Sequence, residues 1–156
     1  MVKIEAFGFE SEGAFVYDIL KSHLLFSELS EEQLRQLSDP RYITSVERNK
    51  SLFTTGQICD GIYVLIEGMI KEQFTDEVYK THYLGSLLGI ASVVSKSEKY
   101  DSTARCESAC RLVFIPRDNC MQLFSSYERF ELNACLFYLH HHLNFMKQHL
   151  DLLEVG

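Results

Sequence analysis

The residue types that could support catalysis or metal binding are present, but their spacing suits neither chemistry. Three histidines are consecutive, at positions 140–142, so on a helix they point in three directions and cannot bind one metal ion together. His82 is the single histidine in the strand-like segments. The sequence has no phosphate-binding glycine loop, nucleophile elbow or paired-carboxylate pattern. It therefore predicts neither an enzyme nor a metal site.

Cysteine usage and charge limit the surroundings and partners of the chain. The five cysteines are odd in number and lack the repeated spacing of metal ligands, and no leader pattern precedes them. We therefore expect free thiols and a cytoplasmic location. The net charge of −7 opposes phosphate backbones, so we expect no direct nucleic-acid binding by this chain. The apolar runs are too short to cross a bilayer, and we expect no membrane partner.

Residues 1–40 are predicted to form a helical lead-in. Apolar residues recur at helical spacing from 15 to 26. A second, short helix should begin after Ser30, because Ser30 and Gln33 match a capping box with acidic residues between them. Pro40 is expected to end this helix.

The hydrophobic pattern becomes strand-like from residue 41 to residue 116. Short segments rich in β-branched and aromatic residues are separated by turn signals. The predicted strands are residues 41–48, 50–54, 61–66, 69–75, 77–84, 101–106 and 110–115. Between the fifth and sixth strands, residues 87–94 suit a short helix. The predicted fold class is mainly β with flanking helices: an antiparallel, jelly-roll-like β-roll with short N-terminal helices and a long C-terminal helix.

Residues 117–156 are predicted to form the C-terminal helices, one at 118–126 and a longer one at 128–154. Apolar residues of the longer helix alternate in steps of four and three. This seam consists of Leu132, Leu136, Leu139, Leu143, Met146, Leu150 and Leu153. A seam of about three heptads is typical of a coiled coil, so we expect a homodimer through this helix. The alternative is a helix that packs wholly within its own chain.

Several stretches resemble cyclic-nucleotide-binding domains. Residues 25–34 are similar to the family's first helix, and residues 52–57 and 60–70 resemble its most diagnostic stretch, in which Gly56 and Gly68 take turn positions. Residues 104–115 resemble its last strands. The seamed helix after the roll is most similar to the effector domains of catabolite-activator and FNR-type transcription regulators. That resemblance implies a dimer whose chains continue into a covalently attached DNA-binding domain, which this chain lacks.

The same resemblance implies a cassette that holds the cyclic phosphate around the short inner helix. The family has a Glu after the second glycine and an Arg about ten residues later. Here Ile90 and Tyr100 take those positions, and Asp101 places a negative charge beside them. Arg105 falls on the opposite strand face. The tentative ligand-pocket residues are Leu88, Gly89, Ile90, Ala91, Tyr100, Asp101, Ser102 and Thr103. No cofactor is predicted, and conventional cAMP or cGMP binding is disfavoured.

Two functions follow from these patterns. The first is the sensor domain of a dimeric transcription regulator, in which a change in the roll shifts the seamed helix. The second is a degenerate cyclic-nucleotide-binding-like domain of an ion channel, exchanger or scaffold that acts through protein contacts. The identity of the ligand and of the output does not follow from the sequence.

Overall fold

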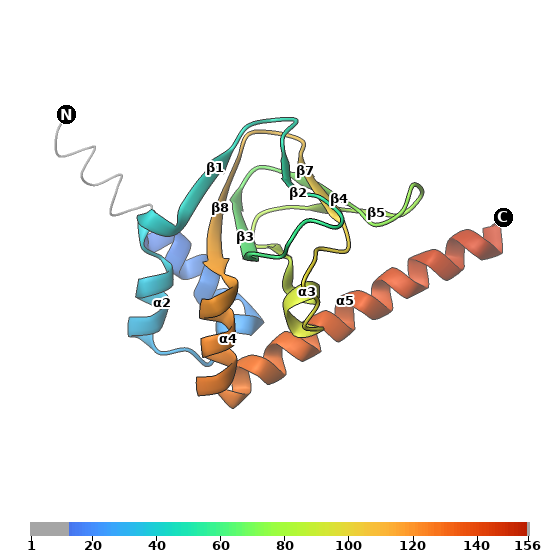
Figure 1. Ribbon diagram of the computed structural model, residues 1–156. Coiled ribbons are helices and arrows are strands. Elements are labelled where there is room, and N and C mark those ends of the chain that lie inside the picture. The colour runs from blue at the N-terminus through green and yellow to red at the C-terminus, as the bar shows by residue number, and fades with distance from the viewer. Residues whose placement is uncertain (1–12, 156) are drawn as a thin grey trace.

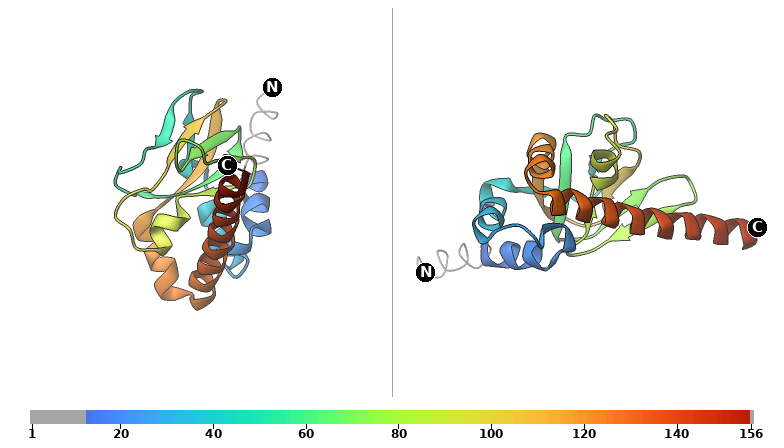
Figure 2. Two further views of the ribbon diagram at one scale, coloured as in Figure 1. Left: turned by 90° about the vertical axis from the view of Figure 1, so that its right-hand side faces the viewer. Right: turned by 90° about the horizontal axis from the view of Figure 1, so that it is seen from below.

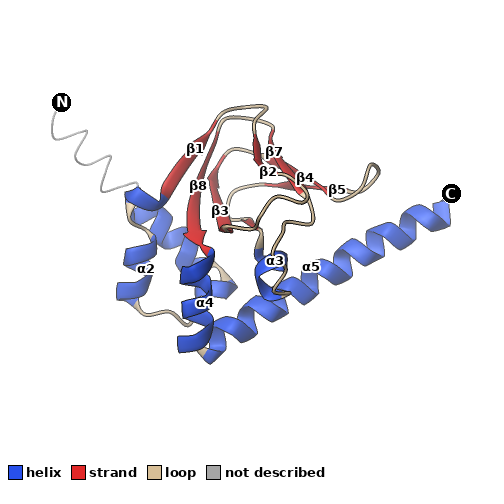
Figure 3. Ribbon diagram, in the orientation of Figure 1, coloured by secondary structure: helices blue, strands red, loops and turns tan. Residues whose placement is uncertain are grey.

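The protein forms a β-roll of two four-stranded antiparallel sheets, with helices at one end and a long helix beside it (Figures 1 and 3). The computed structural model describes residues 13–155, and the side chains of residues 13–147 and Leu150. The sheets have the strand orders β1-β8-β3-β6 and β2-β7-β4-β5. The strands are β1 (Ile43–Val46), β2 (Ser51–Phe53), β3 (Gly61–Glu67), β4 (Ile70–Gln73), β5 (Tyr79–His82), β6 (Leu87–Leu88), β7 (Thr103–Cys106) and β8 (Cys110–Pro116). The predicted fold class is confirmed.

The helices precede, interrupt and follow the roll. A helical segment covers residues 13–22. It is followed by η1 (Leu24–Phe26), α2 (Glu31–Leu37), η2 (Pro40–Tyr42), α3 (Ile90–Val94), α4 (Arg117–Ser126) and α5 (Glu128–Val155). Figure 2 shows α5 running along one side of the roll and extending past it. Each residue of β3 from 61 to 66 is buried, because the second sheet covers one face of this strand while α3 and α4 contact it.

The local signals of the lead-in are satisfied as expected. The backbone N–H of Gln33 donates to Ser30 Oγ at 3.2 Å, and Gln33 Oε1 accepts from the backbone N–H of Ser30 at 2.8 Å. This capping box fixes the start of α2. Pro40, however, does not end α2: the helix stops at Leu37, and Pro40 begins η2, where its missing N–H costs nothing.

The segment 87–94 was predicted to be helical throughout, and this is wrong for its first two residues. Leu87 and Leu88 form β6, which pairs with Val64 and Tyr63 of β3. The backbone then turns at Gly89, whose φ of 89° is left-handed, and α3 begins after it. Two buried leucines followed by such a glycine suit a strand end as well as a helix start, because the apolar pattern alone does not separate the two.

The direction of α5 is set by its first turns. Phe130 is fully buried, with ring centroids 6.1 Å from Phe26 of η1 and 5.4 Å from Phe124 of α4. Asn133 Nδ2 donates to the carbonyl oxygen of Leu24 at 3.1 Å. These contacts hold the start of α5 between the lead-in and α4, so the rest of the helix must run beside the roll.

Gly68 and Gly85 give a matched test of the turns. Both have positive φ, but a Cβ at Gly68 would lie 2.6 Å from the carbonyl oxygen of Ala109 and 2.6 Å from Cys110 Sγ, whereas at Gly85 it would meet nothing within 4 Å. We expect Gly85→Ala to lower the free energy of unfolding by about 1 kcal/mol and Gly68→Ala by at least about 2 kcal/mol. Urea unfolding measures both. Equal losses would contradict the steric argument.

Candidate functional site

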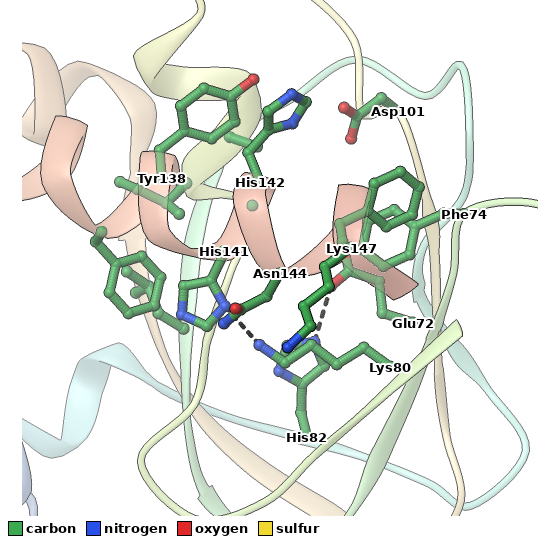
Figure 4. A pocket seen from close by; sticks show the side chains of 16 residues that line it. Glu72, Phe74, Lys80, His82, Asp101, Tyr138, His141, His142, Asn144 and Lys147 are labelled. Atoms are coloured by element: carbon green, nitrogen blue, oxygen red, sulfur yellow. Dashed lines mark hydrogen bonds and ion pairs between the residues drawn. The ribbon is translucent and has the colours of Figure 1, made fainter. Parts of the chain in front are cut away.

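A pocket of about 610 Å³ lies between the roll and α5 (Figure 4). Its roll side comes from β4, β5, β6 and α3, and its other wall comes from α5. The lining residues are Glu72, Phe74, Lys80, His82, Leu87, Gly89, Ile90, Ala91, Asp101, Phe137, Tyr138, His141, His142, Asn144, Phe145 and Lys147. A molecule in this pocket would therefore touch both the roll and the long helix.

A buried polar cluster lies at the bottom of the pocket. Glu72 is 9% exposed, and its two carboxylate oxygens accept from Ser102 Oγ at 2.5 Å and from His82 Nε2 at 2.8 Å. The His82 side chain is 4% exposed, and its Nδ1 has no hydrogen-bond partner among the described residues. A buried ring nitrogen without a partner is uncommon and points to a missing interaction at this position.

A lysine and a histidine join the roll to α5. Lys80 Nζ, on β5, lies 2.6 Å from Nδ1 of His141 on α5. Burial, followed by the nearby positive charge of Lys80, lowers the pKa of His141 to about 4. His141 is therefore neutral at pH 7 and accepts a hydrogen bond from the Lys80 ammonium. Burial also lowers the pKa of Lys80.

Aromatic side chains form much of the remaining wall. The rings of Phe74 and Phe145 have centroids 4.8 Å apart and connect the loop after β4 to α5. On α5, Phe137 lies 4.1 Å from the ring of His141. The contact of Phe74 with Phe145 holds α5 against the roll, and the aromatic rings together give the pocket flat, apolar surfaces.

The structure divides the eight pocket residues predicted from the sequence into two groups. Gly89, Ile90, Ala91 and Asp101 line the pocket, whereas Leu88, Tyr100, Ser102 and Thr103 do not. Leu88 is buried in β6, Ser102 supports Glu72, and Thr103 Oγ1 accepts from the backbone N–H of Thr55 at 3.0 Å.

Tyr100 has a structural role where the family resemblance places the phosphate-binding arginine. Its ring stacks on Phe53 with centroids 3.9 Å apart. Its hydroxyl lies 2.7 Å from Asp60 Oδ1 and 2.7 Å from the carbonyl oxygen of Gly61. The side chain is 2% exposed, so it is part of the core and not of the pocket surface.

Sequence reasoning did not assign the polar residues of β4 and β5, or the residues of α5, to the pocket. In the antiparallel pair, Glu72 lies directly opposite Lys80, and His82 follows two residues later on the same face. This alternation of polar residues on an inward face was the available signal. On α5, the consecutive histidines at 140–142 were considered only as metal ligands and rejected, and Lys147 was not singled out. No group of three described side chains is arranged to hold a metal ion, and no described helix is long and apolar enough to cross a membrane.

The predicted seam lies on the side of α5 away from the pocket lining. Six of its residues have exposed fractions from 44% to 58%. They are Leu132, Leu136, Leu139, Leu143, Met146 and Leu150. The side chain of the seventh, Leu153, lies outside the described residues.

Comparison with known proteins assigns the family. Residues 43–127 match the cyclic nucleotide-binding domain, and the chain belongs to this family. A comparison with curated protein sequences found no match. The resemblance noted in the sequence is therefore confirmed, and the fold supports it.

Solved structures share the fold at low sequence identity. The sensor domain of the transcriptional regulator DNR from Pseudomonas aeruginosa has a TM-score of 0.69 and 22% identity, and the alignment covers 89% of this chain and 93% of that one. PKAR CBD2 bound to Sp-2Cl-cAMPS has a TM-score of 0.65 and 18% identity, covering 93% of each chain. The regulatory domain of Toxoplasma gondii PKA with cAMP has a TM-score of 0.61 and 21% identity, covering 70% of this chain and 43% of that one.

The depressed pKa of His141 predicts acid sensitivity. The folded state keeps His141 neutral down to pH of about 4, whereas an unfolded histidine is protonated below about 6.5, so unfolding takes up a proton in this window. Stability should therefore fall as the pH drops from about 6.5 to about 4. Since the side chain is only half-buried, we expect a loss of about 1–2 kcal/mol.

The measurement is urea unfolding of the unmodified chain, His141→Gln and His142→Gln across this pH range. His141→Gln should lose less stability on acidification than the unmodified chain. His142 is exposed and forms no hydrogen bond with Lys80, and its charge interacts with Asp101, so His142→Gln should not reduce the loss of stability on acidification. Identical pH profiles for all three would contradict the assignment.

Proposed function

We propose that this chain is the effector domain of a dimeric, cytoplasmic transcription regulator. The supporting observation is that one helix, α5, supplies the wall of the pocket on one side and an exposed leucine stripe on the other. A ligand that binds one arrangement of α5 better than another shifts the population of helix arrangements. The output then depends on what the paired helices carry beyond this chain, such as a DNA-binding domain.

The stripe supports a second copy of this chain as the partner. The heptad spacing places its apolar residues on one line along α5, and they remain exposed although the opposite flank packs on the roll. Leaving such a row of leucines in water is unfavourable by about 25 cal/mol for each Å² of apolar surface. Pairing with the same stripe of a second chain would cover it, and the alternative of a wholly intramolecular helix leaves it bare.

The pocket favours a sensor that does not use conventional cAMP or cGMP binding. Tyr100 occupies the position of the phosphate-binding arginine and is committed to Phe53 and Asp60. Ile90 replaces the ribose-binding glutamate. Asp101 lies on the pocket lining beside α3, where its charge would oppose a phosphate.

A second candidate function is regulation of a larger protein through protein contacts. The same fold occurs in PKA regulatory domains, so the roll alone does not separate a transcription regulator from a domain that controls another module. The degenerate cassette suits this alternative as well. The self-association of α5 separates the two, because only the first function requires it.

Substitution in the stripe tests the dimer. We expect the unmodified chain to be a dimer in sedimentation equilibrium, and Leu139→Lys to shift it to monomer because two lysines would face each other at the seam. Leu84→Lys is the matched control: Leu84 is 56% exposed, like Leu139 at 51%, but lies on the roll after β5. It should leave the dimer intact. An unmodified chain that remains monomeric at high concentration would exclude this proposal.

Calorimetric titration tests the nucleotide expectation. With the arginine and glutamate of the cassette absent, several kcal/mol of charge-assisted hydrogen bonding to a cyclic phosphate are missing. We therefore expect no binding of cAMP or cGMP at micromolar concentrations. Micromolar binding of either nucleotide, competitive with any pocket ligand, would show that other groups replace the cassette.

A further inference from the structure

The charged residues that line the pocket are Glu72, Lys80, Asp101 and Lys147. Lys80 projects from β5, and Lys147 projects from α5 toward the same region, whereas Asp101 lies on another part of the wall (Figure 4). The negative group of a ligand would be attracted by Lys80 and Lys147 and repelled by Asp101.

Glu72 lies directly opposite Lys80 and weakens this attraction, but its carboxylate is bound by two other residues. Both of its oxygens already accept hydrogen bonds, one from the buried Ser102 and one from His82. Ser102 and His82 thus hold the Glu72 carboxylate in place at the sheet. The hydrogens of Ser102 Oγ and His82 Nε2 are already given to Glu72, so the cations left to hold a second anion are Lys80 and Lys147.

Lys80 is half-buried, and among the described residues it forms no ion pair with a carboxylate. Its partner is the neutral ring of His141. A half-buried ammonium that donates only to a neutral imidazole keeps unsatisfied donors, and an anion is the partner that would stabilise it most.

His82 supplies the second, independent observation. The side chain is 4% exposed and lines the pocket, and its Nδ1 has no partner among the described residues. A carboxylate of a ligand would accept a hydrogen bond from this nitrogen when the ring donates through both of its nitrogens. The rings of Phe74, Phe137 and Phe145 provide apolar walls that suit a flat organic body.

From these observations we propose that the pocket binds a small aromatic carboxylate or a similar organic anion, whose charged group lies between Lys80 and α5. The negative group then sits at the β5 and α5 end of the pocket, away from α3 and Asp101. This inference rests on the proposed function, because it identifies the class of ligand to which the sensor responds. The ligand would bridge the roll and α5 through Lys80, His141 and Lys147.

Calorimetry with 2-naphthoate and its neutral isostere 2-naphthamide tests the charge preference. The two probes have nearly the same shape, so their difference reports the carboxylate. We expect 2-naphthoate to bind at least about tenfold more tightly, as for one charge-assisted hydrogen bond in a partly buried site. Equal affinities, or no binding of 2-naphthoate at millimolar concentration, would overturn the proposal.

Lysine variants locate the charged group. Lys80→Met should remove the preference for 2-naphthoate while leaving the affinity for 2-naphthamide unchanged. Lys71→Met is the matched control, because it removes the same charge from the neighbouring strand β4. Lys71 lies over the ring of Tyr79 and does not line the pocket. It should keep the preference. A preference that survives Lys80→Met, or is lost equally in Lys71→Met, would refute the assignment.

A second variant keeps the test decisive if Lys80→Met does not fold. Lys147→Met changes an exposed residue of α5 and should reduce the preference about threefold, as for a weaker, more solvated charge. Failure of this inference is distinct from failure of the proposed function. In the first case the chain still forms dimers but does not distinguish the two probes, and in the second it is a monomer whatever its ligand preference.

Discussion

The burial of Phe130 against Phe26 and Phe124 is the interaction on which both surfaces of α5 depend. Removing a fully buried phenylalanine ring costs about 3–5 kcal/mol, far more than the exposed contacts farther along the helix provide. With the first turns fixed in this way, the aromatic flank must face the roll and the leucine stripe must face outward. The pocket and the stripe are thus two consequences of one packing contact.

Tyr100 is part of the core at the position where the family resemblance places the phosphate-binding arginine. Tyr100 stacks on Phe53 and bonds to Asp60, so it links the segment before β7 to the start of β3. Burial raises the pKa of Tyr100, which keeps the hydroxyl protonated and able to donate. The polar groups that line the pocket come from β4, β5, α5 and the segment before β7, which carries Asp101.

Much of the fold follows from local patterns in the sequence. The capping box at Ser30, the strand alternation and the heptad stripe each depend on residues close together in the chain, and each predicts its element. The strand at Leu87 was missed because its pairing with β3 is a long-range contact. The pocket was only half predictable for the same reason. Gly89 and Asp101 follow from the family resemblance, but the approach of His141 to Lys80 spans 61 positions and depends on the direction of α5.

The hydrogen bond between Lys80 and His141 links the position of the roll to the rotation of α5. His141 and Leu143 are two residues apart, which places them about 200° apart around the helix axis. A rotation of α5 about its axis that moves the imidazole of His141 toward the pocket therefore moves the leucine stripe, on the opposite side of the helix, through the same angle. In the proposed dimer, the leucines of the two α5 helices would pack against each other, so that a rotation of α5 in one subunit would rotate α5 in the other.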